Sequence, residues 1–206
     1  METYREEHII YLWESFLTGD DKSFSTIYEL YINQLISYGY KLCTDREIVH
    51  DSLQEIFIDL FLKRNKLNVD IRNLKAYLFI SLRNSLVKKI KNKKRFELLD
   101  LKDNNFEFDF DVEYSHQDRL IEDEISRELK KVLQAATKKL PAKQKEIIYL
   151  KFEEEMSYPE IAKIMNISIE SARKLLYRAL LSLRSKVHSD SFTPSFFILF
   201  SKISLK

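Results

Sequence analysis

The fold of the C-terminal half is decided by the stretch Ser157-Tyr158-Pro159-Glu160-Ile161-Ala162-Lys163-Ile164-Met165-Asn166-Ile167-Ser168. Ser157 and Glu160 have the spacing of a capping box, in which a serine and an acid three residues later satisfy the first amides of a helix. Asn166 follows at the point where the chain must turn, and asparagine accepts the left-handed backbone conformation better than most residues. Ser168 can cap a further helix. The stretch therefore predicts two helices joined by a tight turn.

The second of these helices has two contrasting faces. Its apolar face, which we expect to be buried, consists of Ala172, Leu175, Leu176, Ala179, Leu180 and Leu183. Its polar and basic face includes Ser171, Arg173, Lys174, Tyr177 and Arg178. The recognition helix of a DNA-binding helix-turn-helix needs this arrangement, because Arg and Lys contact guanine edges and phosphates in the major groove. A helix-turn-helix can also be a plain packing motif, so the pattern alone leaves both interpretations open.

Helical periodicity extends toward the N-terminus. Apolar residues recur every three or four positions in segments that begin near Ile9, Phe24, Thr44 and Leu74. Thr44-Asp45-Arg46-Glu47 has the spacing of a second capping box, with Thr44 as the cap. Only two glycines and three prolines occur in 206 residues, too few for the many turns of an all-β fold. We therefore expect an all-α protein.

The distribution of charge predicts the domain boundaries. Seven basic residues and no acid lie between Arg83 and Arg95, whereas eleven acids and two bases lie between Glu97 and Glu124. The basic block can attract nucleic-acid phosphates or be a solvated helix end. The acidic segment can mimic nucleic acid or be a solubilising spacer. We expect two small helical domains joined by an acidic linker and followed by an aromatic tail, with boundaries at 1–96, 97–118, 119–188 and 189–206.

Several classes of protein are disfavoured by composition. The single cysteine, Cys43, excludes an intrachain disulfide and fits a reducing compartment, so we expect a cytoplasmic protein. The N-terminus lacks a signal-peptide core, and no apolar run approaches the length of a membrane span. No phosphate loop, activated nucleophile or spaced His and Cys ligands are found. We therefore expect no enzyme activity, catalytic residue, metal, cofactor or small-molecule substrate.

The C-terminal pattern resembles the C-terminal domain of the extracytoplasmic-function (ECF) group of RNA polymerase sigma factors. The matching segments are Leu140-Pro141-Ala142-Lys143-Gln144, Ser157 to Ala162, Asn166-Ile167-Ser168 and Tyr177-Arg178-Ala179-Leu180. In that family the domain binds the promoter −35 element and docks on the flap of the polymerase β subunit. The resemblance implies that Ser171, Arg173, Lys174, Tyr177 and Arg178 face DNA. Two residues depart from the family: Glu170 stands where glycine is usual, and Leu175 where a basic residue is common.

The N-terminal half also resembles this family. Asp51-Ser52-Leu53-Gln54-Glu55-Ile56-Phe57 is similar to the segment by which sigma factors bind the coiled coil of the polymerase β′ subunit. This implies a docking role for Asp51, Gln54 and Glu55, although periodicity alone is equally compatible with a solvated helix face. Ala76-Tyr77-Leu78 and Arg83-Asn84 resemble the helix that meets the −10 element. The resemblance makes Asn84 and the polar Asn65–Asn73 loop candidates for reading −10 bases. Tyr77, where the family more often has tryptophan, can stack on opened bases. Lys88, where the family often has an acid, and Lys91 belong to the basic block that can attract −10 phosphates.

Together these observations predict an ECF-type sigma factor that binds core RNA polymerase and directs promoter-specific initiation. The expected partners are core polymerase, promoter DNA and an anti-sigma factor, which in this family is often membrane-bound. The alternative is a helix-turn-helix regulator that acts without core polymerase. A helical adaptor with no DNA role would leave the exposed basic face around Arg173 and Arg178 without an explanation.

Overall fold

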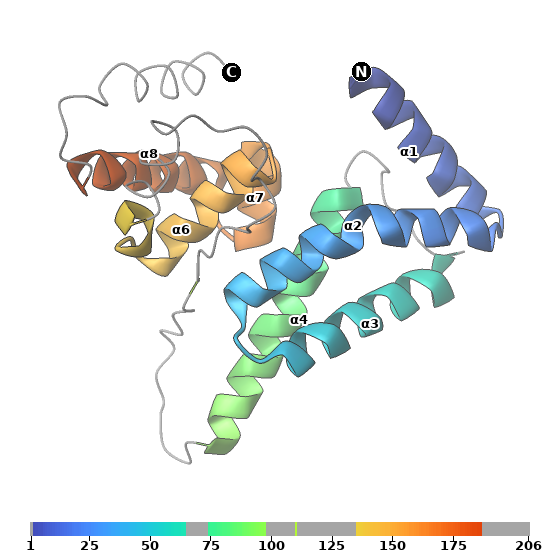
Figure 1. Cartoon of the computed structure of the whole chain (residues 1–206), viewed down its shortest axis with the longest axis horizontal. Helices are drawn as coiled ribbons and strands as arrows, with labels where there is room; N and C mark the ends of the chain where they lie inside the picture. The colour runs from blue at the N-terminus through green and yellow to red at the C-terminus, as the bar shows by residue number, and fades with distance from the viewer. Residues whose placement is uncertain (1, 65–73, 98–109, 111–134, 187–206) are drawn as a thin grey trace, which may run out of the picture.

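The computed structural model describes residues 2–64, 74–97, 110 and 135–186, and the regular elements in these ranges are all helical. The expected all-α class is confirmed. The N-terminal half contains α1 (Glu2–Leu17), α2 (Asp21–Leu42), α3 (Arg46–Leu62) and α4 (Leu74–Glu97). The C-terminal half contains α6 (Ala142–Ile148), the π-helical turn η3 (Tyr149–Glu153), α7 (Tyr158–Met165) and α8 (Ile169–Lys186). Figure 1 shows the two groups of helices side by side.

The N-terminal half is built around α2, which packs against α1, α3 and α4. Aromatic rings fill the space between α1, α2 and α3, with Phe16 stacked on Phe24 at a centroid distance of 5.2 Å. Gly39 lets α2 and α3 approach closely, because a Cβ atom there would lie 2.6 Å from a methyl group of Val49. These contacts fix α3 and α4 as neighbours with their polar faces outward.

The cap of α3 differs from the sequence prediction. Asp45, not Thr44, is the N-cap: its backbone is extended and its carboxylate accepts a hydrogen bond from the Ile48 amide at 3.3 Å. The same carboxylate pairs with Lys93 of α4 at 2.9 Å, and this hydrogen bond is the main reason that the pKa of Asp45 lies below its ordinary value. A contact from a distant helix thus favours the later of two adjacent capping residues.

The C-terminal half has the predicted helix-turn-helix. The Ser157 amide donates to the Glu160 carboxylate at 2.7 Å, as a capping box requires. Asn166 ends α7 in the left-handed conformation, with φ of 54°. The Ser171 amide donates to the Ser168 hydroxyl at 3.1 Å and thereby caps α8. All three local predictions are confirmed.

The two halves are packed against each other along a seam. Helices α4 and α7 are in contact, and one hydrophobic cluster takes residues from both halves. Phe110, from the acidic linker, is fully buried in this cluster, with its ring 6.2 Å from Tyr38 and 5.8 Å from Tyr149. The linker therefore supplies a core residue. The rest of the linker, the 65–73 loop and the aromatic tail lie outside the described residues.

Candidate nucleic-acid and polymerase interfaces

The basic face of α8 is open to solvent. Ser171, Arg173, Lys174, Tyr177 and Arg178 are all exposed, and Tyr177 keeps 57% of its accessible surface. The opposite face of the helix is buried through Ala172, Leu176, Ala179 and Leu180. The structure thus brings the five predicted −35 residues together on one surface.

Neighbouring side chains orient part of this surface. The Arg173 guanidinium lies 5.5 Å from the centre of the Tyr158 ring, at the start of α7. Lys174 pairs with Glu170 at 2.6 Å, and both side chains are exposed. Glu170, which departs from the family pattern, therefore places a negative charge against one of the cations predicted to contact DNA.

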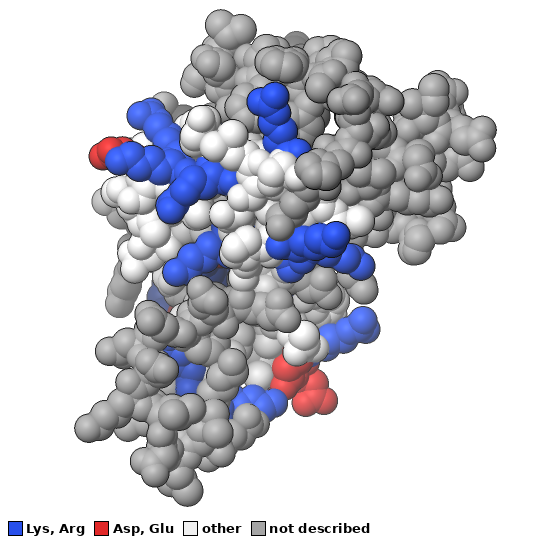
Figure 2. Space-filling view, turned by 90° about the vertical axis from the view of Figure 1, so that its left-hand side faces the viewer, with Lys and Arg blue, Asp and Glu red and all other residues white. Residues whose placement is uncertain are grey.

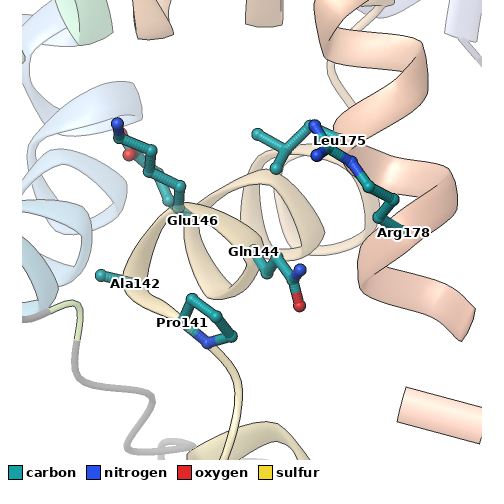
Figure 3. A pocket seen from close by; sticks show the side chains of 7 residues that line it. Pro141, Ala142, Gln144, Glu146, Leu175 and Arg178 are labelled. Carbon is teal, nitrogen blue, oxygen red and sulfur yellow. The ribbon is translucent and has the colours of Figure 1, made fainter. Parts of the chain in front are cut away.

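A cleft of about 240 Å³ lies between α6 and α8 (Figure 3). Leu175 and Arg178 line it from α8, and Pro141, Ala142 and Gln144 line it from the start of α6. Leu175 is half-buried, so its departure from a basic residue places an apolar wall in this cleft instead of a further DNA contact. The Gln144 side-chain oxygen is buried without a hydrogen-bond partner among the described residues. No local sequence pattern predicts this cleft, because its walls come from two helices that are distant in the chain.

The exposed face of α3 is larger than the sequence prediction. Asp51, Gln54 and Glu55 are exposed as expected. Ile58 and Leu62 continue the same helical face and are exposed by 48% and 73%. Ile58 lies four residues after Gln54 and Leu62 seven residues after Glu55, and residues at these intervals share a helix face. The result is a mixed acidic and apolar stripe, which we call the α3 stripe.

Helix α4 presents the predicted −10 residues less uniformly. Asn84, Lys88 and Lys91 are exposed, whereas Tyr77 is half-buried. The four positions share one helix face, since they are spaced by seven, four and three residues. Arg83, next to Asn84, is only 8% exposed and faces the seam between the two halves.

A buried polar cluster occupies this seam. The Glu146 carboxylate of α6 accepts from the Tyr38 hydroxyl at 2.8 Å and from the Arg83 guanidinium at 2.7 and 3.4 Å. Burial is the main cause that raises the pKa of Tyr38 well above its ordinary value, with Glu146 adding to it. Burial is the largest single influence on the pKa of Arg83 and lowers it, but the charge and hydrogen bond of Glu146, together with Tyr38, outweigh burial and the net shift is upward. Arg83 and Glu146 are therefore a charged pair held inside the protein.

A second set of contacts crosses the seam beside this cluster. Lys75 of α4 pairs with the Glu154 carboxylate at 2.8 Å, and Glu154 also accepts from the Tyr149 hydroxyl at 2.6 Å. The Tyr149 and Tyr38 rings are stacked, 5.9 Å apart and 9° from parallel. Tyr149 and Glu154 flank the π-helical turn η3. Such turns inside α-helices redirect side chains and are frequent at functional sites.

Among the described residues on the face that Figure 2 presents, Lys and Arg side chains outnumber those of Asp and Glu. Among the described residues, no group of three His, Cys, Asp or Glu side chains is arranged to hold a metal ion. Within the same ranges, no helix combines the length and the hydropathy needed to cross a membrane.

Comparison with known proteins identifies relatives of both halves. The Sigma-70 region 2 profile matches residues 27–96, and the Sigma-70 region 4 profile matches residues 130–183. The ECF RNA polymerase sigma factor SigW of Bacillus subtilis is 25% identical over 171 residues, which cover 82% of this chain and 91% of SigW. The ECF sigma factor SigM of the same organism is 26% identical over 155 residues, or 74% and 88% of the two chains.

Two solved structures share the fold. The sigma factor RpoE, in complex with the anti-sigma factor NepR from Bartonella quintana, gives a TM-score of 0.58 at 23% identity, covering 82% of this chain and 99% of that chain. CnrH, in complex with the cytosolic domain of CnrY, gives a TM-score of 0.51 at 18% identity and covers 87% and 97% of the two chains.

Proposed function

The chain belongs to the ECF group of sigma-70-type sigma factors, and on that premise we propose how its surfaces divide the work of promoter-specific initiation. The observation that carries the proposal is the presence of both family regions, in order, each with an exposed polar face on one helix. A helix-turn-helix regulator that works without polymerase is not favoured, because it would leave the region 2 match unexplained.

The α3 stripe is the proposed docking surface for the β′ coiled coil. Its acidic part, Asp51 and Glu55, can pair with basic residues of the partner and guide the encounter. Its apolar part, Ile58 and Leu62, is exposed in the free chain and gains most from burial in a complex. An apolar centre with a polar rim is the common anatomy of a protein interface.

The α8 face and the α4 face are the proposed promoter contacts. Arg173, Lys174, Tyr177 and Arg178 of α8 read the −35 element in the major groove, where arginine can bond bidentately to guanine. Lys88 and Lys91 attract phosphates of the −10 region, while Tyr77 and Asn84 hold bases of the opened strand by stacking and hydrogen bonding. The polymerase carries out the chemistry, so this chain needs no catalytic group of its own.

Two further assignments follow from the proposed role. A subunit of RNA polymerase works where the chromosome is, which places this chain in the cytoplasm. The solved relatives RpoE and CnrH are bound to NepR and to the cytosolic domain of CnrY. We propose that an anti-sigma factor likewise binds this chain and competes with the polymerase.

Co-elution with core RNA polymerase on size exclusion tests the proposal. We expect the wild-type chain to co-elute, and Glu55→Lys or Ile58→Glu to weaken binding by on the order of 100-fold, since each disturbs the centre of the stripe. Glu14→Lys is the matched control: it makes the same charge change at an exposed site on α1 and should leave binding unchanged. A wild-type chain that never co-elutes with core polymerase would refute the proposal.

A further inference from the structure

Arg83 differs from the other basic residues of α4 because it is buried. It immediately precedes Asn84 of the proposed −10 face, yet its side chain is only 10% exposed and its guanidinium lies against Glu146 of the opposite half. The basic residues Lys88 and Lys91 on the same helix are exposed. The helix proposed to hold the −10 strand therefore has an arginine that the C-terminal half covers.

The Arg83–Glu146 pair has the same geometry as a contact between an arginine and a phosphate group. Both Glu146 oxygens accept from the guanidinium, at 2.7 and 3.4 Å. Guanidinium groups bind carboxylate and phosphate with the same two-pronged arrangement. Glu146 thus occupies the donors that a phosphate of the promoter strand would otherwise use.

The packed arrangement is too small to read both promoter elements. Positions −10 and −35 are about 25 base pairs apart, which is about 85 Å along B-DNA. A compact chain of this length has a radius of gyration of about 17 Å and spans about 45 Å. The halves must therefore separate on a promoter, and separation necessarily breaks the Arg83–Glu146 contact, because the two residues belong to different halves.

We propose that Tyr38, Arg83 and Glu146 form a latch that keeps the free chain closed, and that Glu146 is an internal competitor which releases Arg83 to the promoter strand on opening. The proposal rests on the proposed sigma function. It adds a residue to the DNA-contacting set and a device that keeps this contact unavailable until the halves separate.

The chemistry of the seam explains why Glu146 controls the equilibrium. Glu146→Gln takes a carboxylate charge away from a buried guanidinium, and Arg83→Gln takes the guanidinium away from a buried carboxylate, so each change disfavours the closed form. Replacing both partners by apolar side chains of similar volume avoids this penalty and can favour the buried state. Single and double substitutions at the latch are therefore expected to act in opposite directions.

The distance between the halves measures the latch directly. Spin labels at Glu29→Cys on α2 and Ser185→Cys on α8, both exposed positions, in a Cys43→Ala background, report it in the full chain without polymerase or DNA. We expect one short distance for the otherwise wild-type protein. Glu146→Gln and Arg83→Gln should each shift the equilibrium toward long distances by on the order of 100-fold. Arg83→Met/Glu146→Met should restore the short distance.

Binding to a fluorescein-labelled duplex with an unpaired bubble separates the two roles of Arg83. Glu146→Gln should bind about tenfold more tightly than wild type, with a salt slope steeper by about one, because one more arginine reaches a phosphate. Arg83→Gln should open the chain without this gain. Asp59→Asn, which makes the same charge change in an exposed pair with Lys63 of α3, should alter neither distance nor affinity by more than about twofold.

The outcomes distinguish the latch from the underlying function. A short distance retained in both Glu146→Gln and Arg83→Gln would overturn the latch, even if the chain supports transcription. Equal gains in DNA affinity for these two variants would overturn the role of Arg83. Opening of both single variants, with a gain in affinity for Glu146→Gln alone, would support the latch, whereas failure of core polymerase to bind the wild-type chain would count against the proposed function and not against the contact between the halves.

Discussion

Helices α8 and α4 both carry basic residues that we propose to contact nucleic acid, but these residues differ in exposure. On α8, Arg173, Tyr177 and Arg178 are exposed, and the partners nearest to them belong to the same half. On α4, Arg83 is buried against Glu146 of the other half, and Lys75 is paired with Glu154. If our assignments hold, the proposed −35 surface is accessible before the polymerase binds, whereas the proposed −10 surface gains Arg83 only when the halves separate.

The largest effect is expected on the basic face of α8. Arg173→Ala/Arg178→Ala removes two groups proposed to contact bases or phosphates, each worth about 1–3 kcal/mol. We therefore expect a loss of on the order of 100-fold or more in affinity for a duplex containing the −35 element, measured by fluorescence anisotropy. The distance between the halves should not change. A loss below about threefold would show that α8 is not the reading helix.

The second effect is a dependence of the closed-to-open equilibrium on pH, which we expect to arise from Tyr38. The pKa of Tyr38 is raised in the closed form, while a solvent-exposed tyrosine titrates near 10. The neutral Tyr38 hydroxyl therefore contributes fully to the stability of the closed form below about pH 10. As pH rises further this contribution is lost, and the ratio of closed to open chains falls by up to about tenfold per pH unit. Spin-label distances recorded between pH 8 and 11 should show opening at the alkaline end.

Tyr38→Phe is the control for this pH dependence. It keeps the ring stacked near Tyr149 but removes the titrating hydroxyl, so opening should vary less with pH. The Tyr149 hydroxyl, whose pKa is also raised by burial, remains in both proteins. The same alkaline opening in wild type and Tyr38→Phe would assign it to Tyr149 instead.

The sequence predicted the exposed face of α8 better than the contact of α4 with the C-terminal half, for a physical reason. The capping box at Ser157, the turn at Asn166 and the exposed face of α8 follow from contacts between residues three or four positions apart. The Arg83–Glu146 pair joins residues 63 positions apart, and no local pattern specifies which distant half will cover which helix. The burial of Phe110 was not predicted either, because its acidic neighbours indicate a solvated linker.

The exposure of Ile58 and Leu62 and the burial of Glu146 have local sequence signals that our predictions did not use, whereas the choice of Asp45 as a cap has none. Ile58 and Leu62 share the helical face of Gln54 and Glu55, so their exposure could have been suspected from spacing alone. Glu146 is a single acid beside Ile147 and Ile148 in a short helix, which is a sign that a buried partner must exist. Asp45 displaced Thr44 as the cap of α3 because Lys93 pairs with its carboxylate, a contact between two helices.

A smaller effect is expected from Glu170→Gln on α8. The substitution removes the carboxylate that pairs with Lys174 at 2.6 Å, and both groups are exposed. Lys174 would then be available to phosphate, and repulsion between Glu170 and DNA would disappear. We expect a gain of about two- to fivefold in affinity for duplex DNA at low salt, fading as salt rises. A decrease in affinity would show that Glu170 itself contacts a base.

The smallest effect is expected at Glu155, in the turn between η3 and α7. Glu155 follows η3 with φ of 55°, a conformation that glycine adopts without steric cost. Glu155→Gly should leave the free energy of unfolding unchanged or raise it by up to about 1 kcal/mol, because relief of strain is partly offset by the entropy of the unfolded chain. Chemical denaturation monitors this change. A destabilisation greater than about 1 kcal/mol would mean that the Glu155 side chain supports the seam.

Run-off transcription with core RNA polymerase, on a pool of templates with randomised upstream sequence, tests whether α8 and α4 read separate promoter elements. We expect the wild-type chain to select templates with two separated conserved elements, and Arg173→Ala to relax selection at the upstream element alone. Lys88→Ala/Lys91→Ala should instead weaken initiation on all selected templates. Transcripts that are the same with and without this chain, or selection of only one element, would contradict this expectation.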